Sequence, residues 1–184
     1  MTSRNHISNL RKCKAGDKKA FAILCEENYD YVYRIAFRIV AIEEDVKDIV
    51  QEAFIRVWKN ISLYNERIKF TTWLYTIVTN LCIDRIRKQK NHADIYCEEA
   101  LEKVNHSNEE DLFAKKDLAS IIACIANELS PKQRTIFVLR DLEGLDMKEI
   151  ATITKLSSSR VKSNLWHARK TIREKLVTVY KVEY

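Results

Sequence analysis

The sequence predicts an all-α protein in which two small helical domains are joined by a flexible linker. The 184 residues include two glycines and one proline, far too few for the turns of a β protein. Apolar residues recur at helical spacing near both ends of the chain, and an acidic segment without clear periodicity lies between them. We therefore expect a first domain over 1–90, a linker over 91–112 and a second domain over 113–184. Helical structure is expected to resume over 111–127.

The formal net charge of +6 is distributed unevenly along the chain. Residues 1–90 carry 17 basic and 11 acidic side chains, residues 91–129 carry 3 and 9, and residues 130–184 carry 12 and 6. Two basic blocks separated by an acidic segment suggest two domains that face DNA and a tether that does not. A basic excess that serves solubility alone is the alternative that charge by itself leaves open.

Several classes of protein do not fit the sequence. No apolar run reaches the length of a membrane span, and the polar N-terminus lacks a signal peptide, so we expect a cytoplasmic protein without direct membrane insertion. The five cysteines and four histidines are scattered and form no Cys-x-x-Cys pair, which argues against a disulfide framework or a metal site. No nucleotide-binding motif is present, and we expect neither a cofactor nor a small-molecule substrate.

Three amphipathic helices are expected in the first domain, over residues 18–40, 43–61 and 70–90. The second has a broad apolar stripe that must face the core, formed by Val46, Ile49, Val50, Ala53, Phe54, Val57 and Ile61. Its other side carries Asp45, Asp48, Glu52, Ile55 and Lys59. Because DNA phosphates would repel this acidic face, it suits a basic protein partner with an apolar centre. An ordinary solvated helix face is the alternative that spacing leaves open.

The third helix presents residues that suit an unpaired nucleic-acid strand. Its core stripe consists of Phe70, Leu74, Ile77 and Leu81. Trp73, Asn80 and Arg87 recur every seven residues and share one edge, where a ring, an amide and a guanidinium can stack on, read and clamp a strand. The preceding polar loop carries Tyr64, an aromatic residue without a helical neighbour, and stacking on an unpaired base contributes roughly 1–3 kcal/mol. The alternative is that Trp73 belongs to the core.

The C-terminal quarter has the pattern of a helix-turn-helix. A capping box with proline at the first helical position starts a helix at Ser130, and Gly144 ends it. A second capping box begins at Asp146, and a turn over 155–158 leads into the last helix. The inward face of that helix consists of Val161, Leu165, Ala168, Ile172 and Leu176, and the outward face of Ser159, Arg160, Ser163, His167 and Lys170. A helix that is cationic and hydrogen-bonding outward, after a tight turn, is typical of major-groove reading.

Three blocks of the sequence resemble a known family. They are DVKDIVQEAFIRVW, FTTWLYTIVTNLCIDRIRK and LSPKQRTIFVLRDLEGLDMKEIA followed by SSRVKSNLWHARKTIREKL. In order and spacing they are similar to the extracytoplasmic-function (ECF) group of bacterial RNA polymerase sigma factors, in the sigma-70 family, over residues 18–176. The resemblance implies a sigma region 2-like helical bundle and a region 4-like helix-turn-helix. It also implies a non-enzymatic alternative sigma factor that binds core polymerase, recognises −10 and −35 promoter elements and melts the promoter.

The resemblance implies three sets of site residues. Core RNA polymerase would be bound at the flap and at the clamp coiled coil of its largest subunit, the latter through Asp45, Asp48, Gln51, Glu52 and Ile55. The −10 DNA would be bound by Tyr64, Trp73, Asn80, Arg87 and Lys88, with Tyr64 and Asn80 at a pocket for a flipped base. The −35 DNA would face Arg160, Lys162, Ser163 and His167, with Arg140 and Lys148 on the flanking backbone.

The reading helix departs from the family pattern. Relatives often have a glycine-threonine pair where this chain has Ser159 and Arg160, and arginine where Asn164 and His167 stand. A changed set of reading residues implies a changed promoter sequence, and Arg160 would contact either a base or a phosphate. The resemblance further implies an anti-sigma protein as a partner.

Two other functions are compatible with parts of the sequence. A stand-alone helix-turn-helix regulator would act without polymerase, but such proteins commonly dimerise, and no dimerisation helix, ligand pocket or phosphoacceptor domain is recognisable. A nuclease would need clustered carboxylates with metal ligands, or a nucleophile with its base. Asp45, Asp48 and Glu52 are the single tight acidic group, and the other donors are missing around them.

Overall fold

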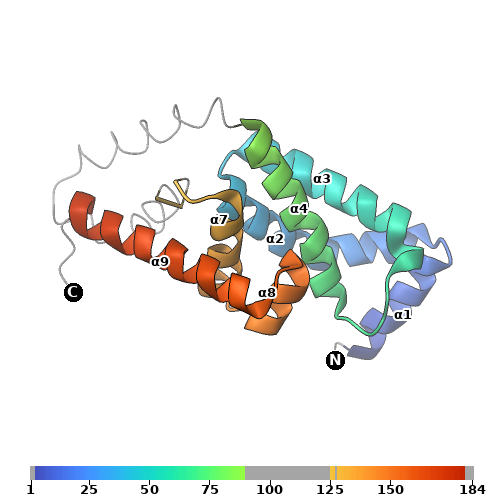
Figure 1. Ribbon diagram of the computed structural model, residues 1–184. Helices are drawn as coiled ribbons and strands as arrows, with labels where there is room; N and C mark the ends of the chain where they lie inside the picture. Colours follow the sequence, from blue (N-terminus) through green and yellow to red (C-terminus); the bar gives the residue numbers. More distant parts are fainter. Residues whose placement is uncertain (1–2, 90–124, 127, 181–184) are drawn as a thin grey trace. The chain divides into compact units, whose positions relative to one another are not determined.

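The computed structural model describes residues 3–89, 125–126 and 128–180. Within these ranges every regular element is a helix, and the chain divides into two compact units (Figure 1). The predicted all-α fold with two helical domains is confirmed. The expected linker over 91–112 lies outside the described residues, as does the expected helix over 111–127 except at its end.

The N-terminal part of the chain contains four α-helices, and the last of them continues beyond Cys82, where the first unit ends. These are α1 (Ser3–Lys14), α2 (Lys18–Val40), α3 (Glu43–Asn60) and α4 (Phe70–Gln89), with a 3-10 turn, η1 (Ile61–Leu63), after α3. The three predicted helices are confirmed to within a residue. Helix α1 was not predicted, although it packs on α2 and buries Leu10 and Cys13.

Local hydrogen bonds explain where these helices begin and end. Gly16 follows α1 with a φ of +88°, in the left-handed region that glycine adopts most readily. The carboxylate of Asp17 then caps α2 by accepting hydrogen bonds from the backbone N–H groups of Lys19 and Ala20. At the other end of α2, Ala41 is left-handed, and its N–H donates to the carbonyl of Phe37.

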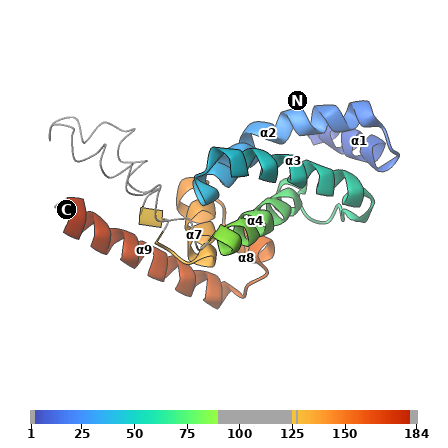
Figure 2. The same ribbon diagram turned by 90° about the horizontal axis from the view of Figure 1, so that it is seen from above.

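The core of the N-terminal unit lies where α2, α3 and α4 turn their apolar stripes toward one another. Helix α2 packs against α3 (Figures 1 and 2), and the Tyr31 ring of α2 stacks on the Tyr75 ring of α4 with centroids 6.1 Å apart. The largest fully buried side chains are Leu24, Val32, Ile35 and Ile39 of α2, Val46 and Val57 of α3, and Leu74 and Val78 of α4. Every predicted core residue of α3 is buried except Phe54, which is half-buried.

The C-terminal unit contains the predicted helix-turn-helix. It comprises α7 (Pro131–Phe137), a π-helical turn η2 (Val138–Leu142), α8 (Met147–Thr154) and α9 (Ser158–Tyr180). The capping box at Ser130 is present in both halves, because the Ser130 hydroxyl accepts from the Gln133 N–H and the Gln133 amide oxygen accepts from the Ser130 N–H. Asp146 caps α8, and Lys155, with a φ of +53°, ends it.

Helix α9 packs its apolar stripe against α7. All five residues predicted for that stripe are buried, and three of them, Ala168, Ile172 and Leu176, share a cluster with Ile125, Ala126, Leu129 and Phe137. The five residues predicted for the outward face of α9 are all exposed. The helical spacing therefore assigned both faces correctly.

Gly144 offers a clean test of the turn before α8. Its φ is +71°, and a Cβ added there would meet no atom within 4 Å. We expect Gly144→Ala to lower the free energy of unfolding by about 1 kcal/mol, because the left-handed backbone is strained for alanine. Gly144→Asn should cost less, since asparagine tolerates this conformation. Chemical denaturation of both variants checks the prediction, and equal losses would contradict it.

Two further properties concern the described ranges as a whole. None of their helices combines the length and apolarity needed to cross a membrane. Across 3–89, 125–126 and 128–180 there is also no group of three His, Cys, Asp or Glu side chains placed to hold a metal ion.

Candidate protein and nucleic-acid interfaces

The outer face of α3 combines acidic and apolar side chains at the surface. Asp48 and Gln51 are exposed, and Ile55 keeps 39% of its surface exposed despite being apolar. Glu52 is partly exposed, and its carboxylate accepts a hydrogen bond of 2.7 Å from the guanidinium of Arg56. Four of the five residues predicted for a protein partner therefore lie on the surface of α3.

The fifth predicted residue, Asp45, does not belong to this exposed face. Only 9% of its surface is accessible, so the prediction that it lies outward is wrong. The reason is its register: Asp45 precedes Ile49 by four residues and Ala53 by eight, so it extends the buried stripe of α3. It also stands in the first helical turn, where the helix dipole favours a carboxylate.

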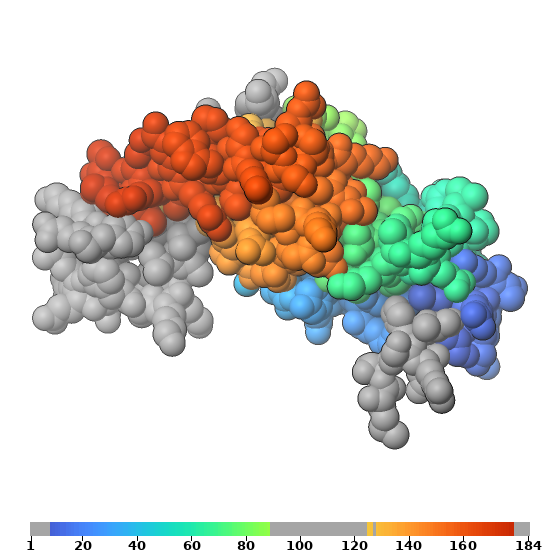
Figure 3. All heavy atoms as spheres, turned by 60° about the horizontal axis from the view of Figure 1, so that its bottom comes forward, coloured from blue at the N-terminus to red at the C-terminus, as the bar shows by residue number. Residues whose placement is uncertain are grey.

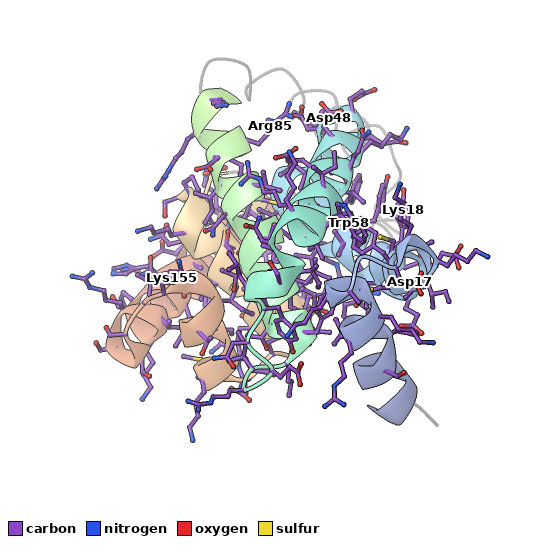
Figure 4. All side chains as sticks on the ribbon, turned by 90° about the vertical axis from the view of Figure 1, so that its right-hand side faces the viewer. Asp17, Lys18, Asp48, Trp58, Arg85 and Lys155 are labelled. Atoms are coloured by element: carbon purple, nitrogen blue, oxygen red, sulfur yellow. The ribbon has the colours of Figure 1, made fainter. Side chains whose placement is uncertain are left out.

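An apolar groove adjoins this face and was not predicted. It has a volume of about 680 Å³ and lies between α2 and α3. Its lining residues are Lys18, Phe21, Tyr29, Lys47, Val50, Gln51, Phe54, Ile55 and Trp58. The Phe21 and Trp58 rings meet there with centroids 4.8 Å apart, and Figure 4 shows Trp58 with Lys18 on the α2 side and Asp48 further along α3. The groove could have been inferred from the spacing of Phe54 and Trp58, two large aromatic residues that lie one helical turn apart at the edge of the core stripe.

The loop between α3 and α4 is ordered around Tyr64. The sequence suggested that Tyr64 has no helical neighbour, and this is wrong, because its ring packs against Phe70 and Trp73 with centroids 5.7 and 5.3 Å away. The side chain is 6% exposed, and its hydroxyl donates a 2.6 Å hydrogen bond to the carbonyl of Ile68. Burial, reinforced by the nearby carboxylate of Glu66, raises the pKa of Tyr64 above its ordinary value. Tyr64 therefore shapes the loop and does not present a free face to a base.

The most exposed apolar residue of this loop is Leu63, which precedes Tyr64. It is 77% exposed, more than any other large apolar residue that the structure describes as exposed. The loop after it is braced by an Asx turn, in which the Asn65 side chain accepts from the Arg67 N–H at 3.0 Å. Leu63 was missed because the few apolar residues of this mostly polar loop follow no helical periodicity.

The predicted edge of α4 is present on the surface. Trp73 is half-buried, so it serves both the core and the surface, and Asn80, Arg87 and Lys88 are exposed. The Arg87 guanidinium lies 3.8 Å from the Asp84 carboxylate, an exposed pair that neighbouring anions can readily displace. This edge offers an aromatic ring, an amide and two cations along one helix.

The outward face of α9 carries hydrogen-bonding and cationic side chains. Arg160, Lys162, Ser163 and His167 are all exposed, and Figure 3 shows α9 in red and orange along the surface of the C-terminal unit. The Asn164 amide donates to the Arg160 carbonyl at 2.7 Å and is thereby directed along its own helix.

Trp166 is a further residue on α9 that the sequence analysis did not assign. It is 58% exposed, its ring meets the His167 ring edge-on at 4.8 Å, and the Lys170 ammonium lies 5.4 Å from its centroid. An exposed tryptophan among cations suits apolar contact with a thymine methyl group or a sugar. Trp166 could have been assigned to this surface from its position, one residue before His167 on the predicted reading helix.

Two arginines hold the segment that connects α7 to α8. Arg140 is partly buried and donates a 2.7 Å hydrogen bond to the carbonyl of Leu145, which occupies part of its guanidinium. Arg169 of α9 makes a two-pronged contact with Asp141, at 2.6 and 2.9 Å, and this hydrogen bonding raises the pKa of Arg169. Lys148, in the first turn of α8, is exposed. The orientation of α9 is thus tied to the turn that precedes α8.

Comparison with known proteins identifies the family. Residues 24–92 match the family model of sigma-70 region 2, and residues 119–172 match that of sigma-70 region 4. Over 176 residues the chain is 33% identical to the ECF RNA polymerase sigma factor SigW of Bacillus subtilis, covering 91% of this chain and 94% of the relative. The chain is an ECF sigma factor of the sigma-70 family. It is also 30% identical over 176 residues to the ECF RNA polymerase sigma-E factor of Escherichia coli K12, with 91% and 92% covered.

Solved sigma factor structures share the fold. CnrH, solved in complex with the cytosolic domain of CnrY, aligns with a TM-score of 0.69 at 20% identity, covering 96% of this chain and 99% of CnrH. The sigma factor RpoE of Bartonella quintana, solved with the anti-sigma factor NepR, aligns with a TM-score of 0.65 at 20% identity, covering 88% and 99%. As an ECF sigma factor the protein is a transcription initiation factor that works with core RNA polymerase and promoter DNA. It is neither an enzyme nor a stand-alone regulator.

Proposed function

We propose that the outer face of α3 and the adjoining groove form the docking site for the clamp coiled coil of core polymerase. The observation that carries this proposal is the pairing of acidic Asp48 and Glu52 with an accessible apolar centre at Ile55, next to an apolar groove. A face of this kind repels DNA phosphates and fits a basic helical partner with apolar residues at its middle. Asp45 lies outside this face, as a buried residue of the first turn of α3.

The edge of α4 and the loop before it then engage the −10 element. Asn80 has the amide donors and acceptor needed to read a base edge, and Trp73 offers a ring on which an unpaired base can stack. Arg87 and Lys88 would hold the phosphates of the melted strand. Leu63, which is exposed directly before Tyr64, would contact bases as the strands separate.

The outward face of α9 reads the −35 element in the major groove. Lys162, Ser163 and His167 are the proposed base readers, and Arg160 stands at the start of the helix, where phosphate or base contact is possible. Trp166 adds an apolar contact beside His167. Lys148 and Arg140 would touch the flanking backbone, with part of the Arg140 guanidinium already engaged by Leu145. The flap of core polymerase would hold this unit against the −35 DNA.

We further infer that an anti-sigma protein regulates this chain. CnrH and RpoE were both solved with proteins bound to them, CnrY and NepR. A groove lined by Phe21, Phe54 and Trp58 would accept an apolar helix and withhold the α3 face from polymerase. The proposed place of action is the cytoplasm, with domains over 1–90 and 113–184 joined by an acidic linker over 91–112.

In vitro transcription tests the proposed function. Purified core polymerase is supplied with a promoter library, with and without this protein, and the transcript starts are sequenced. We expect new starts that share a paired −35 and −10 motif. If folded, pure protein binds core enzyme in a pull-down but yields no new starts on the library, the assignment of promoter recognition to the α4 edge and the α9 face is rejected.

A further inference from the structure

The last residue of α1 contacts the loop that precedes α4, although fifty residues separate them in sequence. The Lys14 ammonium donates to the backbone carbonyl of Tyr64 at 3.0 Å and to the Glu66 carboxylate at 3.2 Å. It also lies 5.4 Å from the centroid of the Tyr64 ring. Lys14 therefore engages the backbone, a neighbouring charge and the ring of one loop.

Helix α1 holds Lys14 in a fixed position. Leu10 and Cys13 are 4% and 1% exposed, so the last turn of α1 is anchored in the unit. The chain then turns at Gly16, and Asp17 immediately caps α2. Because this corner is short and hydrogen-bonded, the backbone of Lys14 stays beside the loop, which keeps the loop within reach of the Lys14 ammonium.

The contacts of Tyr64 connect Lys14 to the proposed −10 surface. Tyr64 follows the exposed Leu63, and its ring packs on Trp73, which belongs to the proposed stacking edge of α4. Its hydroxyl closes the loop by donating to Ile68. A displacement of the Tyr64 backbone would therefore shift both Leu63 and the environment of Trp73.

We propose that Lys14 is a positioning residue for −10 recognition, which holds the loop over residues 63–69 in the conformation that receives the melted strand. The inference rests on the proposed function of the loop and of the α4 edge. Lys14 touches no base in this account, and it acts through Tyr64 and Glu66. Its loss leaves the loop free to adopt other conformations, which weakens base preference at −10 while leaving −35 reading and polymerase docking in place.

The experiment compares Lys14→Met, Lys14→Arg and Lys12→Met with the original protein. Lys12 is the matched control, because it is an exposed lysine in the same last turn of α1. Hydrogen exchange of the free protein reports on the amides of residues 64–69. Transcription from libraries randomised at −10 or at −35, with reconstituted holoenzyme, reports base preference, and a direct binding assay reports affinity for core polymerase.

With Lys14→Met we expect amide exchange in the loop to become about tenfold faster and base preference at −10 to fall about tenfold, since a charge-assisted contact is lost. Preference at −35 and affinity for core polymerase should be unchanged. Lys14→Arg should recover most of both effects, because it retains the charge and the donors, and Lys12→Met should behave as the original protein.

The proposal is overturned if loop exchange is unaffected, if −10 preference survives, or if −35 preference falls equally. An identical response to Lys12→Met would overturn it as well. Faster loop exchange in a protein whose original form never starts transcription would reject the −10 role together with the proposed function. In that case the contact would stand as a purely structural one.

Discussion

Replacing Asp48 and Glu52 together with lysine is expected to abolish binding to core polymerase while the fold stays intact. Both side chains reach the surface of α3, and neither belongs to its buried stripe. If a basic helix docks here, two attractive charges become two repulsive ones at the interface. We expect the dissociation constant to rise at least about a hundredfold. Binding of the purified variant to core enzyme in the absence of DNA measures this directly.

The control for this variant keeps the geometry and the charge change but moves them to another helix. Glu26 and Asp30 are exposed on α2 and also lie one turn apart, so Glu26→Lys with Asp30→Lys changes the net charge equally. Loss of the Glu52–Arg56 pair and the new repulsion should alter the free energy of unfolding by less than about 1 kcal/mol. If the α3 variant still binds core polymerase as tightly as the α2 control, the docking site has been assigned to the wrong face.

Two kinds of sequence signal predicted the helices: the caps at Ser130 and Asp146 predicted α7 and α8, and a long apolar face predicted the others. In α2, α3, α4 and α9 the buried stripe requires apolar residues every three or four positions, and this periodicity can be recognised in the sequence. Helix α1 was missed because it is short and mostly polar, and the burial of Leu10 and Cys13 depends on its packing against α2.

The errors at the candidate sites arose where burial depends on residues that are distant in sequence, or where a polar residue occupies a core position. Tyr64 is covered by Phe70 and Trp73 because the loop folds back onto α4, and helical spacing contains no information about that fold-back. Asp45 was assigned outward because it is charged. Its register on α3 placed it inward, and register is the more reliable guide in a helix whose other face is fully packed.

Reversing the charges of Arg160 and Lys162 is expected to have the second largest effect on transcription. It should impair −35 recognition and leave polymerase binding unchanged. Both side chains are exposed in the first turns of α9, one on each side of the outward face that contains Ser163. Arg160→Glu with Lys162→Glu removes two cations and places two carboxylates against phosphates. We expect transcription from starts that depend on the −35 element to fall at least about a hundredfold. We also expect the slope of log DNA affinity against log salt concentration to become shallower, by the equivalent of about two phosphate contacts. Transcription and salt-titrated binding measure the two effects.

The two charge reversals together separate the functions that the sequence left open. A sigma factor needs both surfaces, so each variant should fail in transcription, the α3 variant without binding polymerase and the α9 variant while still binding it. A regulator that acts without polymerase would lose DNA binding in the α9 variant and nothing in the α3 variant. The variant Lys12→Glu with Lys19→Glu makes the same change in net charge on exposed residues of the other unit, and it should transcribe normally. If it fails as the α9 variant does, the loss reflects net charge and the reading role of α9 is refuted.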